Sequence, residues 1–245
     1  MSERFFLAAA PTGDRAILTG DEARHLSRVL RGQPGDEVVV FAGTGAEWPA
    51  RIVRVARDEV ELALGGPRPD PARPGPRLTL AVALPKGERQ KWLVEKLTEL
   101  GVDRLVPLVT TRGVAEATAA AQARLERGVI EACKQCGRNQ LMEIGEPRSV
   151  AEAIAERPHG AAAIIADPGG GPLHPAIVSD PRHLLALVGP EGGFTDAEVE
   201  AAKRSGAVRA SLGPHILRIE TAAIALAARL AGCGDTQAPC QPAGG

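Results

Sequence analysis

The chain has 245 residues, of which 44% are hydrophobic and 24% are charged. These proportions exclude a wholly disordered chain, and the length suits one large or two modest domains. Only 2% of the residues are aromatic, which argues against a sheet that stacks RNA bases on aromatic rings. The formal net charge is -1, so a nucleic-acid partner would have to be held by a local basic patch.

No apolar run approaches the roughly 20 residues of a membrane-spanning helix, and Phe5 to Ala10 is too short for a signal-peptide core. We therefore expect a cytoplasmic protein. The four cysteines are too few and too unevenly spaced for a disulfide scaffold. Cys133 and Cys136 continue an apolar helix face without a second Cys/His pair nearby, so we expect them in the core and predict no metal site.

The first part of the chain is predicted to form a small, mostly antiparallel barrel. Its strands are short runs, several alternating apolar with charged residues, bounded by Gly or Asp turns. The predicted strands are Arg15–Thr19, Glu37–Ala42, Pro49–Ala56 and Glu59–Leu64.

A helix over Asp21–Leu30 is predicted to interrupt these strands, with Leu26, Val29 and Leu30 able to face inward. Three arginines at helical spacing form a basic stripe on another face, and two more lie on a nearby strand. These are Arg24, Arg28 and Arg31 on the helix, and Arg51 and Arg54 on the strand. The stripe is a candidate for gripping an RNA backbone, and a solvated helix face is the competing interpretation.

Prolines recur every two or three residues between Gly65 and Pro76, a composition that forbids helix and indicates a semi-rigid linker. We therefore predict a small domain over residues 1–66, a linker over 67–77, a larger domain over 78–235 and a disordered tail over 236–245.

Strands and helices alternate in the larger part, which predicts an α/β domain built on a parallel sheet. The predicted strands are Leu78–Leu84, Arg104–Val109, Ala161–Ala166, Leu184–Val188 and Val208–Leu212. The predicted helices are Glu88–Leu100, Gln122–Cys136, one from Asp196 and one from Arg218.

A glycine-rich segment follows the apolar strand Leu184–Val188 and forms the first candidate site. Gly189–Gly193 precedes Thr195 and Glu198, whose spacing is that of a helix capping box. Such a loop exposes backbone N–H groups at the carboxyl edge of a parallel sheet, where α/β proteins bind ligands. Glu191 would repel a phosphate, so the segment favours another small molecule. A tight structural turn is the competing interpretation.

The second candidate site is Ser211–Ala222, again a strand, a Gly-Pro loop and the start of a helix. Ile219 belongs to the apolar face of that helix and is expected in the core. Arg218 lies at the positive, N-terminal end of the helix dipole, which disfavours a cation. Its presence there therefore requires another explanation. It either pairs with Glu191 or Glu220, or meets an anionic group of a ligand.

Together these segments resemble the ribosomal RNA small subunit methyltransferase E family of the knotted SPOUT superfamily. The resemblance covers about residues 4 to 231. The segments that carry it are Gly189–Phe194, Leu212–Ala222, Lys86–Gly87, Trp92–Gly101, Thr110–Arg112 and Glu131–Arg138 in the larger part, and Arg4–Phe6, His25–Arg31 and Gly35–Asp36 in the smaller. His215, Gly113 and Leu125 depart from the family pattern at positions that bear on RNA contacts.

The resemblance implies a SAM-dependent enzyme that methylates N3 of a single uridine, U1498, in the 16S rRNA of the small ribosomal subunit. It also implies a trefoil-knotted SPOUT domain, a PUA-like RNA-binding barrel and a homodimer. The cofactor-binding positions that it implies are Leu187, Gly189, Glu191, Gly192, Leu212, Gly213, Ile216, Leu217, Thr221 and Ala222.

The remaining site residues are hypotheses about role. Arg218, Glu220 and Arg112 are the catalytic candidates, and no Cys or His nucleophile is required because methyl transfer needs alignment and loss of the N3 proton. The RNA-binding candidates are Arg4, Arg24, Arg28, Arg31 and Lys86. Two other functions fit the same residues: a SPOUT methyltransferase with another rRNA or tRNA target, and a non-catalytic RNA-binding ribosome-assembly factor.

Overall fold

The structure is a computed structural model that describes residues 3–71, 75–113, 118–173 and 182–231. The predicted tail over 236–245 and part of the proline-rich linker lie outside the described residues. The chain forms two compact units. One is Met1–Ala72 with Val129–Leu141, and the other is Arg73–Gly128 with Met142–Gly245. Within the described ranges, no helix is both long and apolar enough to cross a membrane.

The first unit is built on a curled, six-stranded sheet with strand order β1-β3-β4-β5-β2, and β6 pairs with β4. Its strands are β1 Arg4–Phe6, β2 Arg15–Thr19, β3 Glu37–Phe41, β4 Ala46–Val55, β5 Glu59–Leu64 and β6 Arg68–Pro69. All pairs are antiparallel except β1 with β3, so the mostly antiparallel pairing is confirmed.

Apolar and polar side chains alternate along these strands. Because successive side chains of a strand point to opposite faces, the apolar ones gather on one face and form the core of this unit. Val38 and Val40 of β3 and Val60 and Leu62 of β5 are buried together with Phe5. The unit also includes Val129–Leu141, a grouping that the sequence did not indicate.

The single helix expected over Asp21–Leu30 is wrong in its second half. An α-helix, α1, covers Gly20–Arg24, and a π-helical turn, η1, covers His25–Val29, where the Leu30 N–H donates to the His25 carbonyl at 3.1 Å. The wider turn changes the angle between successive side chains. Leu26 is therefore buried as predicted, whereas Val29 is 66% exposed and Leu30 is also exposed.

The second unit is built on a seven-stranded sheet in which every pair is parallel, which confirms the α/β class. The strand order is β10-β8-β7-β12-β11-β13, with β9 beside β8. The strands are β7 Arg77–Val82, β8 Arg104–Val109, β9 Glu143–Ile144, β10 Arg148–Ser149, β11 Ala162–Pro172, β12 His183–Val188 and β13 Ala207–Ser211. The trefoil knot stays a prediction.

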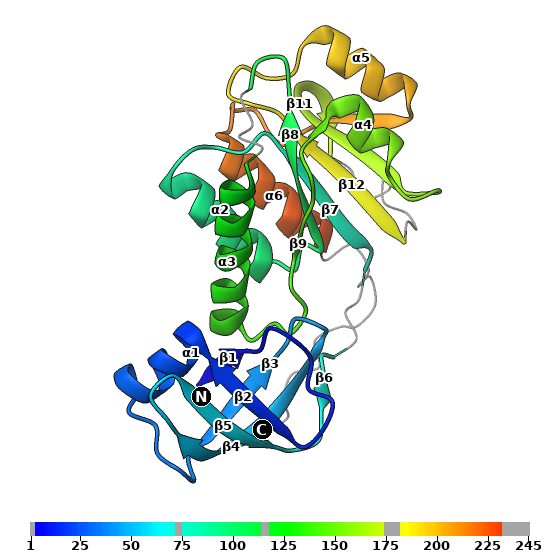
Figure 1. The fold of residues 1–245 in the computed structure, drawn as a ribbon. Coiled ribbons are helices and arrows are strands. Elements are labelled where there is room, and N and C mark those ends of the chain that lie inside the picture. The colour runs from blue at the N-terminus through cyan, green and yellow to red at the C-terminus, as the bar shows by residue number, and fades with distance from the viewer. Residues whose placement is uncertain (1–2, 72–74, 114–117, 174–181, 232–245) are drawn as a thin grey trace, which may run out of the picture. The chain divides into compact units, whose positions relative to one another are not determined.

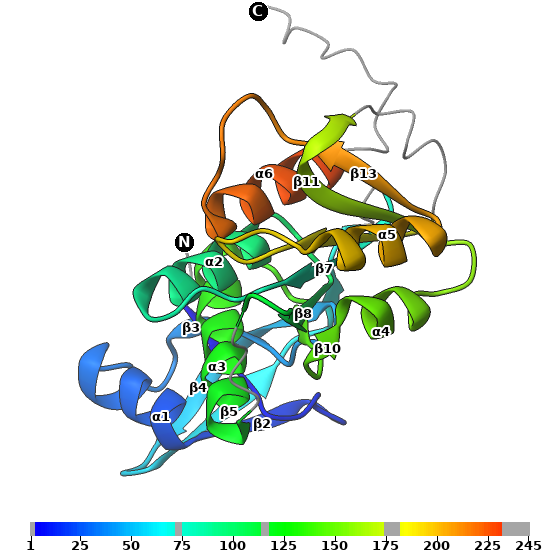
Figure 2. The same ribbon diagram turned by 90° about the horizontal axis from the view of Figure 1, so that it is seen from above.

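Helices cover both faces of this sheet (Figure 1 and Figure 2). The helices that lie wholly in this unit are α2 Glu88–Glu99, α4 Val150–Ala155, α5 Asp196–Arg204 and α6 Ile219–Ala231, and α3 Ala119–Cys136 begins in it. Helix α4 contacts β8, β10 and α5, whereas α6 contacts β7, β12 and α2. Helix α3 belongs to this unit up to Gly128, and its remainder belongs to the first unit.

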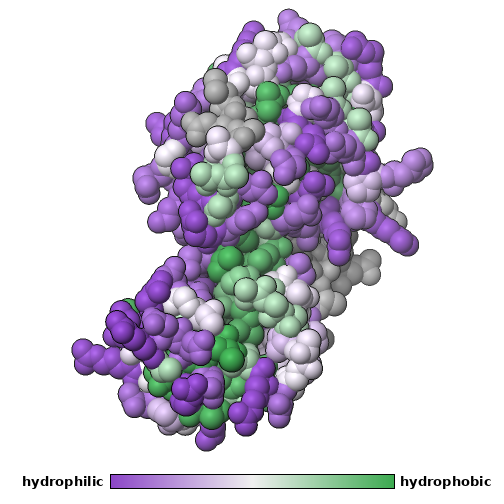
Figure 3. Space-filling view, viewed as in Figure 1, coloured by the Kyte–Doolittle hydropathy of each residue, from purple (hydrophilic) through white to green (hydrophobic). Residues whose placement is uncertain are grey.

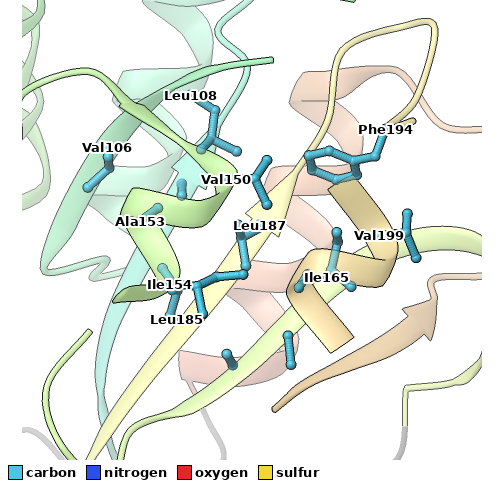
Figure 4. Packing of buried hydrophobic residues seen from close by; sticks show 14 of the residues in the cluster. Val106, Leu108, Val150, Ala153, Ile154, Ile165, Leu185, Leu187, Phe194 and Val199 are labelled. Carbon is cyan, nitrogen blue, oxygen red and sulfur yellow. The ribbon is translucent and has the colours of Figure 1, made fainter. Parts of the chain in front are cut away.

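The central strand β12 is buried on both faces, which explains its continuous apolar sequence. Leu185 and Leu187 pack with Val150, Ile154 and Phe194 in the core under α4 and α5 (Figure 4). Hydrophilic residues cover much of the visible surface of the units, with hydrophobic residues in smaller patches (Figure 3).

Candidate functional site

A cavity of about 320 Å³ opens in the second unit beside the ends of β12 and β13 and the irregular middle of β11. β12 lies beside β11, which lies beside β13, so these three segments meet at one edge of the sheet. The lining residues are Ala166–Pro168, Val188–Phe194, Ser211–Gly213, His215–Leu217, Ile219 and Ala222.

Most of the positions expected to bind a cofactor line this cavity, namely Gly189, Glu191, Gly192, Leu212, Gly213, Ile216, Leu217 and Ala222. Two expected positions do not. Leu187 is fully buried in the core under α4 and α5, because its side chain leaves β12 on that face. Thr221 is exposed on α6 and is absent from the lining.

The glycine loop after β12 has a shape that larger residues would change. A Cβ on Gly189 would lie 3.1 Å from ring carbons of Phe194, and Gly193 has a φ of 69°. The predicted capping box is confirmed: the Glu198 N–H donates to Thr195 Oγ1 at 3.3 Å, and the Thr195 N–H donates to Glu198 Oε2 at 2.7 Å. The loop therefore ends on a fixed helix start.

The segment after β8 is attached to the same region. Arg112 Nη1 donates to the Gly192 carbonyl at 2.7 Å, and the Thr111 N–H donates to Glu198 Oε1 at 2.9 Å. Burial acts to raise the pKa of Glu198, but hydrogen bonds from Thr195 and Thr111 outweigh it and the pKa is lowered. The carboxylate thus holds two loops together in its charged form.

The charged lining of the cavity is acidic. Asp167 and Glu191 contribute carboxylates, and the described residues of the lining include no lysine or arginine. Asp167 accepts a hydrogen bond from Arg209 Nε at 2.8 Å, which fixes its position. This composition suits a ligand that carries positive charge and disfavours a phosphate, as the sequence predicted for this loop.

The pairing considered for Arg218 with Glu191 or Glu220 is not found among the described residues. Arg89 of α2 occupies that place instead, with Nη1 3.4 Å from Glu191 Oε1 and 3.9 Å from Glu220 Oε2. Glu220 is only 5% exposed, and its Oε2 has no hydrogen-bond donor within the described ranges. Arg218 is exposed between the cavity-lining residues Leu217 and Ile219, and no ion pair engages it among the residues that the structure describes.

The basic stripe of the first unit differs from the prediction. Arg24 pairs with Asp21, and Arg28 lies 3.8 Å from Asp58, whereas Arg31 has a φ of 57° and lies beyond the end of η1. The strand arginines Arg51 and Arg54 pair with Glu37 at 3.1 Å and Glu61 at 2.5 Å.

The other two RNA-binding candidates lie in different environments. The Arg4 side chain is 14% exposed, donates to Glu47 and Asn139, and lies over the Phe41 ring at 5.1 Å. Its guanidinium thus serves contacts within the first unit. Lys86 is exposed in the second unit, in the segment between β7 and α2.

The cysteine prediction is half right. Cys133 is fully buried, and burial raises the pKa of its thiol to about 12, whereas Cys136 is exposed. Trp92 of α2 is 46% exposed. In the part of the chain that the structure describes, no three His, Cys, Asp or Glu residues could together hold a metal ion.

Sequence reasoning missed two parts of this region. Ala166–Pro168 lines the cavity because it follows the buried start of β11, and its position at the end of a predicted parallel strand was an available signal. Arg89 carried no signal, since only the packing of α2 against α6 brings it to Glu220.

Comparison with known proteins identifies both units. Residues 73–231 match the family model of an RNA methyltransferase domain, and residues 18–64 match that of an RNA methyltransferase PUA domain. The chain is 30% identical over 217 residues to ribosomal RNA small subunit methyltransferase E of Bacillus subtilis, with 84% of this chain and 85% of the relative covered.

Two solved structures share the fold over nearly the whole chain. Ribosomal RNA small subunit methyltransferase E from Neisseria gonorrhoeae, bound to S-adenosyl methionine, is 29% identical with a TM-score of 0.85, covering 94% of this chain and 96% of that one. A Legionella pneumophila protein in complex with SAM is 29% identical with a TM-score of 0.86, covering 94% and 97%.

Proposed function

The chain belongs to the ribosomal RNA small subunit methyltransferase E family, and we propose that it methylates N3 of one uridine, U1498, in the 16S rRNA of the small subunit, with SAM as methyl donor. The observation that carries the proposal is the acidic, glycine-lined cavity at the carboxyl edge of the parallel sheet. Its loops lie in the unit whose fold is shared with a SAM-bound family member.

The residues of the cavity fit SAM. Gly189 leaves space that a Cβ would fill against Phe194, and Ile216, Leu217 and Ala222 offer apolar surface to an adenine ring or an aliphatic chain. The acidic lining favours the positive charge of the donor. When bound, SAM supplies a methyl group on a positively charged sulfur.

We assign Arg218 to the negative charge that develops on the uracil oxygens when N3 loses its proton. Its guanidinium is exposed beside the cavity loops, and no ion pair engages it within the described ranges. Arg112 holds the Gly192 carbonyl and so keeps the glycine loop in place. Substrate alignment supplies much of the rate, because a methyl transfer requires the acceptor behind the methyl carbon.

Glu220 is better suited to positioning than to taking the proton. Its carboxylate is buried, does not line the cavity and faces Arg89, which also reaches Glu191 of the glycine loop. We therefore assign Glu220 and Arg89 a positioning role: together they hold the start of α6 and the glycine loop in a fixed arrangement.

RNA is proposed to bind the arginine-rich surface of the first unit, with Lys86 acting from the second. The ion pairs of Arg24 and Arg28 are solvent-exposed, so each is weak and a phosphate can replace the carboxylate. Val29 is exposed among these arginines and adds apolar contact area.

Purified protein should be incubated with labelled SAM and 30S subunits from cells that lack the modification. The 16S rRNA is then digested and the labelled nucleoside identified by mass spectrometry. We expect 3-methyluridine at position 1498, and an Arg218→Ala protein should lose most turnover while it still binds SAM. Label at another nucleotide would replace the proposed target, and no label with intact RNA affinity would indicate an assembly factor.

We also propose a homodimer. Because Arg112 donates to the Gly192 carbonyl of its own chain, we propose that it acts on the site of its own subunit. Mixing Arg112→Ala with Arg218→Ala subunits tests this arrangement. If the two arginines acted on one site from different subunits, half of all dimers in an equal mixture would be mixed, each mixed dimer would contain one intact site, and about a quarter of the wild-type activity would return. If both act within one subunit, mixing restores nothing.

A further inference from the structure

The second unit contains another cavity, of about 420 Å³, that shares no residue with the glycine-loop cavity. It is formed by the segment after β7, the start of α2, the first turns of α3 and the segment after β9. Volumes of about 300 to 1,000 Å³ are usual for small-ligand sites. No step of the proposed methyl transfer uses this cavity, so its chemistry needs another explanation.

The floor of the cavity is apolar and its rim is polar. Leu125 and Ile144 are buried at its base, with 6% and 9% exposed. The charged lining residues are Lys86, Arg124 and Glu146, so cations exceed anions. This is the reverse of the glycine-loop cavity, whose lining is acidic, and it suits a ligand with a flat apolar part and a negative charge.

Hydrogen bonds hold the polar side chains in defined positions. Arg124 Nη2 donates to Gln90 Oε1 at 3.0 Å, which fixes the guanidinium and leaves its other N–H groups for a ligand. Gln122 Nε2 donates to Glu126 Oε1 at 3.1 Å, so its amide oxygen can accept from a ligand. A fixed guanidinium plane together with amide groups is the set that recognises the face and edge of a nucleobase.

We propose that this cavity binds one unstacked nucleotide of the substrate RNA, distinct from the uridine that is methylated. The inference rests on the proposed function and extends it. The base would lie on the apolar floor against the Arg124 guanidinium, its edge would meet the amides of Gln90 and Gln122, and Lys86 would contact the phosphate. Recognition of a second extruded nucleotide would let the enzyme read the local shape of the rRNA with few aromatic residues.

Two variants test the cavity in different ways. Leu125→Trp fills its floor without altering a charge, and Arg124→Gln removes the guanidinium without altering the floor. Arg127→Gln is the matched control, because Arg127 is an exposed arginine of the same helix outside the lining. SAM affinity by calorimetry and melting temperature should be unchanged in all three, which establishes that each is folded. If Leu125→Trp does not fold, Arg124→Gln carries the test.

The measurements are the affinity for 30S subunits and kcat and KM for methylation. Loss of one base contact should weaken 30S binding and raise KM by about 5- to 150-fold, with kcat changed much less. A photoreactive 4-thiouridine in the 16S rRNA should cross-link to the peptide around Arg124 in the wild type and not in Leu125→Trp. Arg127→Gln should stay within about twofold of the wild type.

Wild-type 30S affinity in both cavity variants would overturn the inference and leave the methyltransferase assignment intact. Failure of the wild type to methylate 30S subunits would instead overturn the proposed function. In that case the affinity and cross-linking measurements still test whether the cavity binds a nucleotide, because neither depends on turnover.

Discussion

Arg89 links the two segments that the sequence identified separately. It lies between Glu191 of the glycine loop and the buried Glu220 of α6, whose Oε2 has no hydrogen-bond donor in the described part of the chain. A buried carboxylate that loses its neighbouring cation is destabilising, whereas removal of both charges is much less so. Arg89 is therefore a residue whose replacement should affect both stability and cofactor affinity.

Arg89→Gln should lower the free energy of unfolding by about 1 to 2 kcal/mol and weaken SAM binding several-fold. Arg89→Gln with Glu220→Gln should recover most of the stability, and Arg89→Lys should retain most of it. Urea unfolding and titration calorimetry on these proteins, together with the Glu220→Gln single variant, measure both effects. Additive losses in the double variant would show that the two side chains are not coupled.

The buried and exposed cysteines of α3 differ in reactivity. Burial raises the pKa of the Cys133 thiol to about 12, so almost no thiolate exists at pH 8, and Cys136 is exposed. Iodoacetamide at pH 8 should therefore alkylate Cys136 and spare Cys133 in the native protein, and peptide mass spectrometry separates the two. Both should react in urea. Rapid native labelling of Cys133 would show that this part of the core opens readily.

At the scale of elements, the start of α5 depends on a carboxylate that holds two loops. Hydrogen bonds from Thr195 and Thr111 lower the pKa of Glu198 against the opposing effect of burial. A carboxyl group whose folded pKa lies below its unfolded value of about 4.3 stabilises the fold above that value. The stabilisation is lost as the pH falls through the folded pKa.

Glu198→Gln should accordingly be less stable than the wild type at pH 7, by about 0.5 to 1 kcal/mol, since partial exposure limits the effect. The difference should shrink below about pH 4.3 and vanish once Glu198 is protonated in the folded state. Thermal unfolding of both proteins between pH 3 and 7 measures it. A stability difference that does not change with pH would mean that the hydrogen-bonding shape of the Glu198 side chain, and not its charge, stabilises the start of α5.

Strongly patterned elements could be predicted from the sequence, and short or irregular ones could not. The bounds of β2, Arg15–Thr19, and the buried apolar run of β12 followed from local pattern alone. The six-residue helix α4 was missed although Ser149 and Glu152 form a capping box, because one turn and a half carries little periodicity. The π-helical η1 was missed because no local signal distinguishes it from an α-helix.

The candidate site shows the same limit. The loops after two strands were predicted because glycine and capping residues mark them, and the parallel sheet then brings them together. The third segment, with Asp167 in the irregular part of β11, and the Arg89 contact depend on which strands and helices are neighbours. That information is carried by long-range packing and not by the spacing of residues.

At the scale of the whole molecule, RNA has to be attracted by the local placement of charges, because the net charge is close to zero. With 29 basic and 30 acidic residues, the protein has no overall field that attracts RNA. The arginines of the first unit fall into two classes. Arg54 is held by a hydrogen-bonded pair with Glu61, which lowers the pKa of that carboxyl, whereas Arg24 and Arg28 have exposed partners and Arg31 has no ion pair within the described ranges.

Replacing Arg24, Arg28 and Arg31 together by glutamine should weaken 30S binding and flatten its salt dependence. Each phosphate contact adds about 0.7 to 0.9 to the slope of log K against log salt concentration, so the slope should fall in magnitude by about 2. Filter binding between 50 and 200 mM salt measures it. Arg54→Gln is the control, because Arg54 donates two hydrogen bonds to Glu61 of the neighbouring strand and its replacement should change the slope by much less. Equal slopes in the triple variant and the wild type would place the RNA on another face of the first unit.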